Sequence, residues 1–518
     1  MNPLVRSSLL VYAFSLGGLA LTVLSNAVMA AFFGAGREMD VFFAATTIPM
    51  MVGNLLATSL GASFLPIISE SRTRGEEEAW RAATGVINWI VIVTVPVSLA
   101  GMLWARDIIA LVVPGFDAGK AAMAAGMLRW LFPLTVVTCL NEVLCYLCYL
   151  HREFLFPSIG KVLTPFVAIV AMILFRDPIG IWSLVAALLV SESLWFALLT
   201  LRIRRKRYFR FLGASFGVPP QLRNIVAMML PLMAANAASR MIPLFDRYFL
   251  SGLAEGELSV VGYAFKIFQS AAPLLTAGAA VTLFPVFASM ASEKDWRSLA
   301  DLLAKGVRMM LFLSIPAVFL FWAGGKPVIR VLFERGEFGP AHTDGVFRIV
   351  SLYLLAFPAT AIGGLIAQGF YVLRNTRIPL LIDLPLIVVY IGSCALLVPR
   401  IGSEGIPIAY VIFFNGSVLI LTKMLQGLLR EKAPVSFPLT RSSGMHLALG
   451  ALSGGCVYVL RAMIPVTDMW NFAFLALGAL FYFTASKYVL NSEEWQFIEK
   501  EVLRRFLDRD RAEENASV

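Results

Sequence analysis

The chain has 518 residues, of which 59% are hydrophobic and only 15% are charged, and its mean hydropathy is +0.79. Soluble domains carry about a quarter charged residues, so this composition excludes a water-soluble protein. A net charge of +10 is also found in nucleic-acid-binding proteins. Here, however, the basic residues gather at the ends of apolar segments, which argues against a nucleic-acid partner.

Apolar segments long enough to cross a bilayer, about 20 residues, recur along the whole chain. The first is too long for the core of a cleaved signal peptide, so we expect it to remain as a span. We therefore predict an all-α polytopic membrane protein of about fourteen transmembrane helices. In chain order the spans are 9–33, 41–68, 84–113, 122–150, 155–175, 178–201, 225–251, 258–290, 307–334, 344–373, 378–399, 404–426, 443–463 and 467–490.

Charge placement predicts the orientation of these spans. Most of the 43 Lys and Arg residues lie in loops and helix ends on the side of the N-terminus. Cytoplasmic loops show this enrichment, so both termini are predicted to be cytoplasmic in a multi-pass membrane protein. The basic surplus is also expected to contact anionic lipid headgroups, which makes membrane lipids a partner.

The longest polar interruption suggests that two lobes are joined by a linker. A weak internal repeat, in which Pro66 and Pro285 occupy matching places at the ends of the second and eighth spans, favours a duplicated transporter. The tail carries apolar residues on one helical face and an Asn491–Glu494 capping-box spacing, which predicts an amphipathic surface helix. The predicted parts are an N-lobe (1–201), a basic cytoplasmic linker (202–224), a C-lobe (225–426), two further spans (427–490) and the tail (491–518).

Polar groups inside apolar spans are the candidate functional residues, because a charge at mid-membrane costs about 2.5–3.5 kcal/mol or more. Buried ion pairs that hold helices in register are the structural alternative. Both signs of charge occur, so charge alone favours neither an anionic cargo nor a drug cation or coupling proton. The candidate cavity residues are Lys266, Arg240, Asp40, Asn54, Asp246 and Arg247, and the candidate coupling or cavity acids are Glu142 and Glu192.

Catalysis has little support in the sequence. The three histidines, His151, His342 and His446, lie far apart, and the five cysteines lie within apolar runs without metal-site spacing. No phosphate-binding GxxxxGK[ST] loop is present. We therefore predict a transporter rather than an enzyme, without a cofactor or metal and driven by a gradient of a coupling cation, by membrane potential or by substrate concentration.

Three strings give a more specific indication. FFGAGREMDVFFAATTIPMMVGNLLATSLGASFLPIISE (32–70), VLFERGEFGPAHT (331–343) and GFYVLRNTRIPL (369–380) resemble the MurJ/MviN lipid II flippases of the multidrug/oligosaccharidyl-lipid/polysaccharide exporter superfamily. The resemblance implies two pseudo-symmetric bundles around a central cavity plus two extra C-terminal helices. It also implies alternating-access export of a lipid-linked saccharide by a monomer. Asp40 matches the family's acidic position, and Lys266 falls where the family usually has an arginine.

The departures from that pattern leave the cargo open. Leu19, Ser25, Gly53 and Asn54 stand where lipid II flippases usually have arginines, and Phe265 replaces a usual aspartate. The cargo is therefore predicted to be a polyprenyl-(pyro)phosphate-linked saccharide precursor, either lipid II for peptidoglycan or an exopolysaccharide repeat unit. A drug/cation antiporter of the same superfamily is the alternative function.

Overall fold

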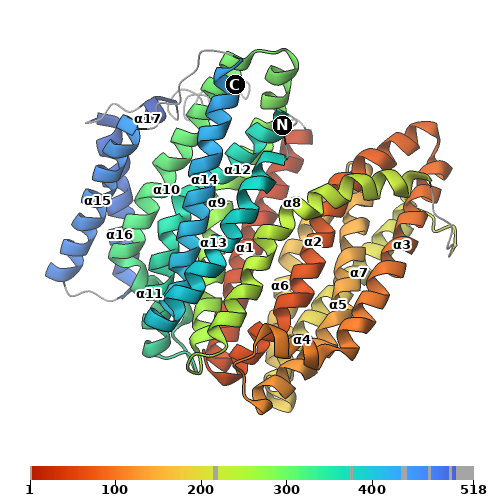
Figure 1. Ribbon diagram of the computed structural model, residues 1–518, viewed down its shortest axis with the longest axis horizontal. Coiled ribbons are helices and arrows are strands. Elements are labelled where there is room, and N and C mark those ends of the chain that lie inside the picture. The colour runs from red at the N-terminus through yellow and green to blue at the C-terminus, as the bar shows by residue number, and fades with distance from the viewer. Residues whose placement is uncertain are drawn as a thin grey trace, which may run out of the picture. The chain divides into compact units, whose positions relative to one another are not determined.

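The computed structural model describes residues 3–213, 220–373, 375, 377–432, 440–464, 468–488 and 493–497, and these ranges contain helices and no strands. Helix α1 begins the chain and α17 is the last described element (Figure 1). Ten segments of this part are long and apolar enough to cross a membrane. The prediction of an all-α polytopic membrane protein is confirmed.

The first of two compact units comprises residues 1–263 with the short segments 335–342 and 391–403. Within it, α2 packs along α5 and α8, α1 packs on α6, and α5 and α6 both contact α7. Its helices are α1 (Pro3–Phe33), α2 (Arg37–Arg74), α3 (Glu76–Leu103), α4 (Ala105–Val112), α5 (Ala118–Leu150), α6 (Leu155–Ile179), α7 (Trp182–Lys206), α8 (Pro220–Leu250) and the first turns of α9 (Glu257–Ser292).

The second unit comprises residues 264–334, 343–390 and 404–518. Helix α10 packs against α12, α15 and α16, and α15 also packs on α16 (Figure 1). Besides the rest of α9, the unit contains α10 (Trp296–Phe333), most of α11 (Pro340–Tyr353), η1 (Leu354–Ala356), α12 (Phe357–Val372), the first part of α13 (Arg377–Ile401), α14 (Gly405–Arg430), α15 (Thr440–Met463), α16 (Asp468–Tyr488) and α17 (Glu493–Phe497). The second part of α13, from residue 391, and the first two residues of η2 (Gly402–Glu404) belong to the first unit.

Each predicted span coincides with one helix or one broken helix. The third span breaks at Trp104 into α3 and α4, and the tenth contains the 3-10 turn η1 between α11 and α12. Helices α2 and α10, each of 38 residues, reach well past the predicted spans, because their polar ends continue the helix. At 1.5 Å per residue each is about 57 Å long, so both extend beyond a hydrocarbon core of about 30 Å. The predicted lobe borders stay a prediction.

The described part of the tail is docked on the protein. Glu494 of α17 is only 5% exposed, and its carboxylate lies 3.3 Å from His446 Nε2 on α15. Tyr482 of α16 donates a hydrogen bond to the Phe312 carbonyl, and its hydroxyl also contacts His446 Nδ1. Glu494 therefore has a tertiary partner, and Asn491, the other half of the predicted capping box, lies outside the described residues. The amphipathic surface helix stays a prediction for the rest of the tail.

Candidate functional site

Asp40 of α2 binds the start of another helix of the first unit, α9. Its Oδ2 accepts a hydrogen bond from Gly256 N at 2.9 Å, and its Oδ1 accepts one from Ser259 N at 2.8 Å. These donors belong to the first turn of α9, where backbone N–H groups have no partner within the helix and the helix dipole favours a negative charge. A residue of α2 thus acts as the N-terminal cap of α9, 216 residues further along the chain.

Lys120 supplies the positive charge that this buried carboxylate needs. Its ammonium lies 3.3 Å from Asp40 Oδ2 and 3.7 Å from Glu255 Oε1. Asp40 is 2% exposed and Lys120 is 7% exposed, so both charges are removed from water and depend on each other.

An exposed layer of ion pairs covers this buried pair. Arg37 bonds Glu255 at 2.8 Å and Asp117 at 2.7 Å. Asp117 also caps the start of α5, since its Oδ1 accepts from the backbone N–H groups of Gly119 and Lys120. The Arg37 guanidinium is the main reason that the pKa of Asp117 falls to about 2. We call Asp40, Lys120, Glu255, Arg37 and Asp117 the Asp40 cluster.

Two positions beside the Asp40 cluster require glycine, because the backbone there passes close to another backbone segment. Gly256 has φ +90°, and a Cβ there would collide with the Ala35 carbonyl oxygen. Gly34 has φ +60°, and its Cβ would lie 2.6 Å from the Glu337 carbonyl oxygen. Side chains larger than hydrogen would therefore force apart the start of α2, the start of α9 and the 335–342 segment.

Next to the Asp40 cluster along the chain, aromatic and cationic contacts join α2 to α8 and α9. Phe43 of α2 packs edge-to-face on Tyr263 of α9, with ring centroids 5.3 Å apart. Arg247 of α8 donates from Nε to Thr47 Oγ1 at 3.3 Å and lies over the Phe43 ring. Asp246 is 3% exposed and Arg247 is 8% exposed, so these predicted site residues are buried in protein.

The remaining predicted site residues are not members of the Asp40 cluster. Arg240 of α8 and Asn54 of α2 are exposed, whereas Lys266 of α9 is half-buried. Phe265, beside Lys266, packs against Tyr353 and Tyr410 in an aromatic group of the second unit. An aspartate at residue 265 would lie among those rings, so the departure from the family pattern has a packing reason.

Glu192 of α7 is joined to α5 through Asn141. The Asn141 amide donates to Glu192 Oε2 at 2.8 Å and to the Glu192 backbone carbonyl at 3.2 Å. Glu142, the other predicted acid, is the next residue of α5. The roles of Glu142 and Glu192 as coupling or cavity acids stay a prediction.

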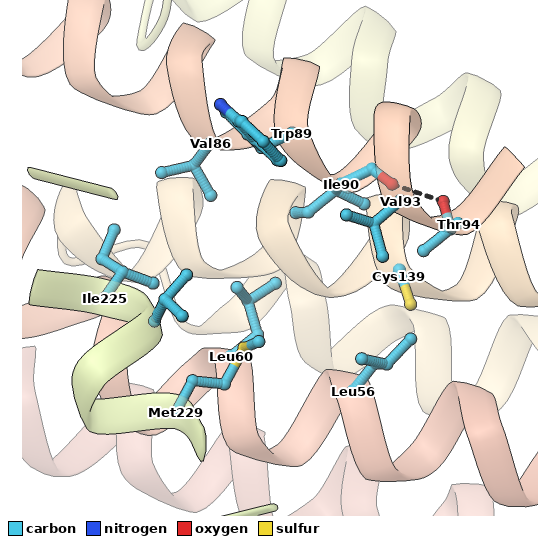
Figure 2. A pocket seen from close by; sticks show the side chains of 11 residues that line it. Leu56, Leu60, Val86, Trp89, Ile90, Val93, Thr94, Cys139, Ile225 and Met229 are labelled. Atoms are coloured by element: carbon cyan, nitrogen blue, oxygen red, sulfur yellow. Dashed lines mark hydrogen bonds between the residues drawn. The ribbon is translucent and has the colours of Figure 1, made fainter. Parts of the chain in front are cut away.

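A separate pocket lies between α2, α3, α5 and α8 (Figure 2). Its walls are apolar except for the Thr94 hydroxyl and the Trp89 indole N–H, and no charged residue lines it. Because the Thr94 hydroxyl already donates to the Ile90 carbonyl, the pocket offers little to bind a phosphate. It is therefore not a site for the charged part of a lipid-linked substrate.

Sequence reasoning missed four of the five members of the Asp40 cluster. Lys120 lies near the start of a span and looks like an ordinary flanking charge. Asp117 did carry a local signal, because an aspartate just before an apolar helix is a common N-cap. Nothing local indicates that Arg37 and Glu255, 218 residues apart, form an ion pair.

Comparisons with known proteins agree with this architecture. The family model described as "Lipid II flippase MurJ" matches residues 29–481. A "Probable lipid II flippase MurJ" of Rhizobium tropici is 25% identical over 88% of this chain and 87% of its own length. The "Lipid II flippase MurJ" of Burkholderia cenocepacia is 24% identical over 78% of this chain and 80% of its own length.

Solved structures show the same fold. One described as "Lipid II flippase MurJ, inward closed conformation" superposes with a TM-score of 0.79 at 19% identity, covering 93% of this chain and 99% of that one. An inward-facing multidrug resistance MATE family transporter of the MOP superfamily gives a TM-score of 0.70 at 17% identity, covering 81% of this chain and 96% of that one. At these identities the likeness is one of fold.

Proposed function

The chain belongs to the lipid II flippase MurJ family, and on that ground we propose that it moves lipid II from the cytoplasmic to the outer leaflet of the bacterial inner membrane. The observation that carries this proposal is the family match, which covers residues 29–481, from the last turn of α1 into α16. The protein acts as a transporter, with both termini cytoplasmic and as a monomer.

The Asp40 cluster suggests how one side of the transporter closes. Alternating access needs an end that is tightly sealed in one state and separates in the other. A carboxylate that caps a distant helix suits this role, because both of its hydrogen bonds to the start of α9 are lost together when that helix moves away. We assign this end to the outer face, since residues 34–40 follow the first span from a cytoplasmic N-terminus.

The cationic residues are the proposed contacts of the substrate pyrophosphate. Lys266, Arg240 and Arg247 supply positive charge from α8 and α9, and the amide of Asn54 supplies a hydrogen-bond donor from α2. Lysine binds phosphate as a point charge without the bidentate fork of arginine. With Lys266 at the position where the family usually has an arginine, the pyrophosphate is therefore expected to bind less selectively, which keeps an exopolysaccharide repeat unit as the second candidate cargo.

Complementation tests the cargo directly. The chain is expressed in bacteria depleted of their own lipid II flippase, and growth and cell shape are followed. Rescue by the wild type supports lipid II. Failure to rescue, with normal membrane insertion, contradicts it, and rescue of a strain lacking an exopolysaccharide flippase would then identify the second cargo. Efflux of a drug cation with neither rescue would favour the antiporter alternative.

Lys266 variants test the proposed substrate contact in the same strain. Lys266→Ala should lose rescue, whereas Lys266→Arg should keep it, because only the positive charge is required. Lys305→Ala is the matched control, since Lys305 is an exposed lysine of α10. Equal rescue by the two Lys266 variants would remove this residue from the proposed site.

A further inference from the structure

The last described helix, α17, docks on a buried histidine of the second unit. His446 of α15 is 2% exposed and Glu494 of α17 is 5% exposed, so both side chains are removed from water. The imidazole lies between two partners, because its Nε2 is 3.3 Å from Glu494 Oε2 and its Nδ1 is 3.2 Å from the Tyr482 hydroxyl of α16. Phe312 of α10 packs against the same imidazole, with ring centroids 5.1 Å apart. Four helices of the second unit therefore meet at His446.

The partners of His446 determine how many protons its ring carries. The Tyr482 hydroxyl has one proton, and it donates this proton to the Phe312 backbone carbonyl at 3.0 Å, since a carbonyl can only accept. The hydroxyl oxygen is then the acceptor for His446 Nδ1, so Nδ1 carries a proton. An ionised Glu494 carboxylate can also only accept, so Nε2 carries a second proton. A ring with both protons is positively charged, which makes His446 and Glu494 a buried ion pair.

The other charges around the pair favour the ionised form of Glu494. Arg308 of α10 approaches the second carboxylate oxygen, with Nε 3.9 Å from Oε1. Lys487 of α16 adds a further positive charge nearby, because its ammonium lies over the ring of Trp495, the residue that follows Glu494. Positive charges close to a carboxylate stabilise its ionised form. The proton that His446 and Glu494 share therefore resides on His446.

Loss of this proton weakens the contact between α17 and the rest of the unit. A neutral imidazole has a single N–H, so His446 can donate to Glu494 or to Tyr482 but not to both. If the proton stays on Nδ1, the hydrogen bond to Glu494 is lost. If it stays on Nε2, that bond remains without the positive charge, and Tyr482 must turn its proton from the Phe312 carbonyl to Nδ1. Hydrogen bonds between charged partners are about twice as strong as neutral ones, so both outcomes weaken docking.

We propose that His446 and Glu494 form a proton-dependent latch that holds the start of the C-terminal tail on the second unit. The docked tail retains a proton that the released tail gives up, so docking is favoured at lower pH and weakens as pH rises. Histidine is the side chain that titrates around neutral pH, so the latch responds to physiological changes of pH. The latch goes beyond the proposed function and does not depend on which cargo is moved.

The first test follows amide hydrogen exchange of α17 in the purified full-length protein in lipid nanodiscs, at about pH 6 and about pH 8.5. After correction for the chemical exchange rate at each pH, residues 493–497 should exchange roughly fivefold faster or more at the higher pH. His446→Gln is the decisive variant, because its amide can still donate to Glu494 but does not titrate, so its exchange should be equal at the two pH values. The control His151→Gln, which replaces a histidine of the first unit, should keep the wild-type pH dependence. Equal corrected exchange of the wild type at both pH values overturns the proposal.

The second test observes the ring itself by nuclear magnetic resonance. The chain has three histidines, so protein labelled with ¹⁵N-histidine gives few ring signals, and those lost in His446→Gln belong to His446. Both ring nitrogens of His446 should be protonated at about pH 6. Glu494→Gln should move the loss of the proton to lower pH and remove the pH dependence of α17 exchange, which keeps the proposal testable if His446→Gln does not fold. A neutral His446 in the wild type at about pH 6 contradicts the proposal. Neither measurement contains substrate, so failure here leaves the complementation result standing.

Discussion

We expect that removal of the Asp40 carboxylate opens the outer end of the protein, which we proposed that the Asp40 cluster closes. Asp40→Ala deletes the two hydrogen bonds to the start of α9 and leaves Lys120 as a buried, unpaired charge. Breaking a buried ion pair in this way costs about 3–5 kcal/mol. Each 1.4 kcal/mol changes an equilibrium constant about tenfold. The ratio of closed to open molecules should therefore fall by roughly two to three and a half orders of magnitude.

The opening can be followed with a thiol at Thr47, two turns along the same face of α2 and only 9% exposed. Thr47→Cys, in a background where the exposed Cys456 is replaced by Ala, is treated with a membrane-impermeant reagent from either side. Labelling from the outer side should become at least tenfold faster with Asp40→Ala. Asp40→Asn should act similarly, because its amide would place a donor against Lys120.

Glu38→Ala is the matched control for this experiment, since Glu38 is an exposed acid in the same first turn of α2. It should leave the labelling rate of Thr47→Cys unchanged. If Asp40→Ala, correctly inserted and folded, labels at the wild-type rate, the carboxylate does not hold this end closed. If it labels faster only from the cytoplasmic side, the proposed orientation is wrong.

Three smaller predictions concern stability, measured as the loss of monodisperse protein on heating in detergent. Gly256→Ala should destabilise by about 1–3 kcal/mol, because φ is +90° and the new Cβ meets the Ala35 carbonyl; a neutral result would contradict the tight approach. Arg37→Ala should lower the melting temperature only slightly because its ion pairs are exposed, and a large loss would show that they act as one network. Tyr482→Phe should cost about 1–3 kcal/mol, since His446 Nδ1 and a buried carbonyl lose their shared partner; an unchanged melting temperature would mean that water replaces the hydroxyl.

The helices could be predicted from sequence because their signal is local. An apolar run of sufficient length must be helical in a membrane, since every backbone group has to be bonded within the segment. Asp40 was also found, through resemblance to a family motif. Its partners were not, because Lys120 and Gly256 come from segments 80 and 216 residues away, and such pairings depend on how the helices pack.

The same limit applies to the two acids and to Phe265. Sequence places Glu142 and Glu192 inside spans, but the hydrogen bonds from Asn141 to Glu192 exist only once α5 and α7 are packed. A phenylalanine at residue 265 reads from sequence as the loss of an aspartate. In the structure it contributes a ring to the aromatic group of α9, α11 and α14, so the residue has a packing role at this position.

The division of helix α9 between the two compact units explains how the Asp40 cluster can act as a seal. Its first turns, up to Tyr263, belong to the first compact unit, whereas the helix from Ala264 onward belongs to the second. Asp40 holds those first turns through the backbone, so the bond does not depend on the side chains of α9 and is lost only when the helix end itself moves. Lys120 belongs to α5 and pairs with Asp40 itself, so movement of the start of α9 breaks the two backbone hydrogen bonds together. A seal of this kind is either complete or absent, as alternating access requires.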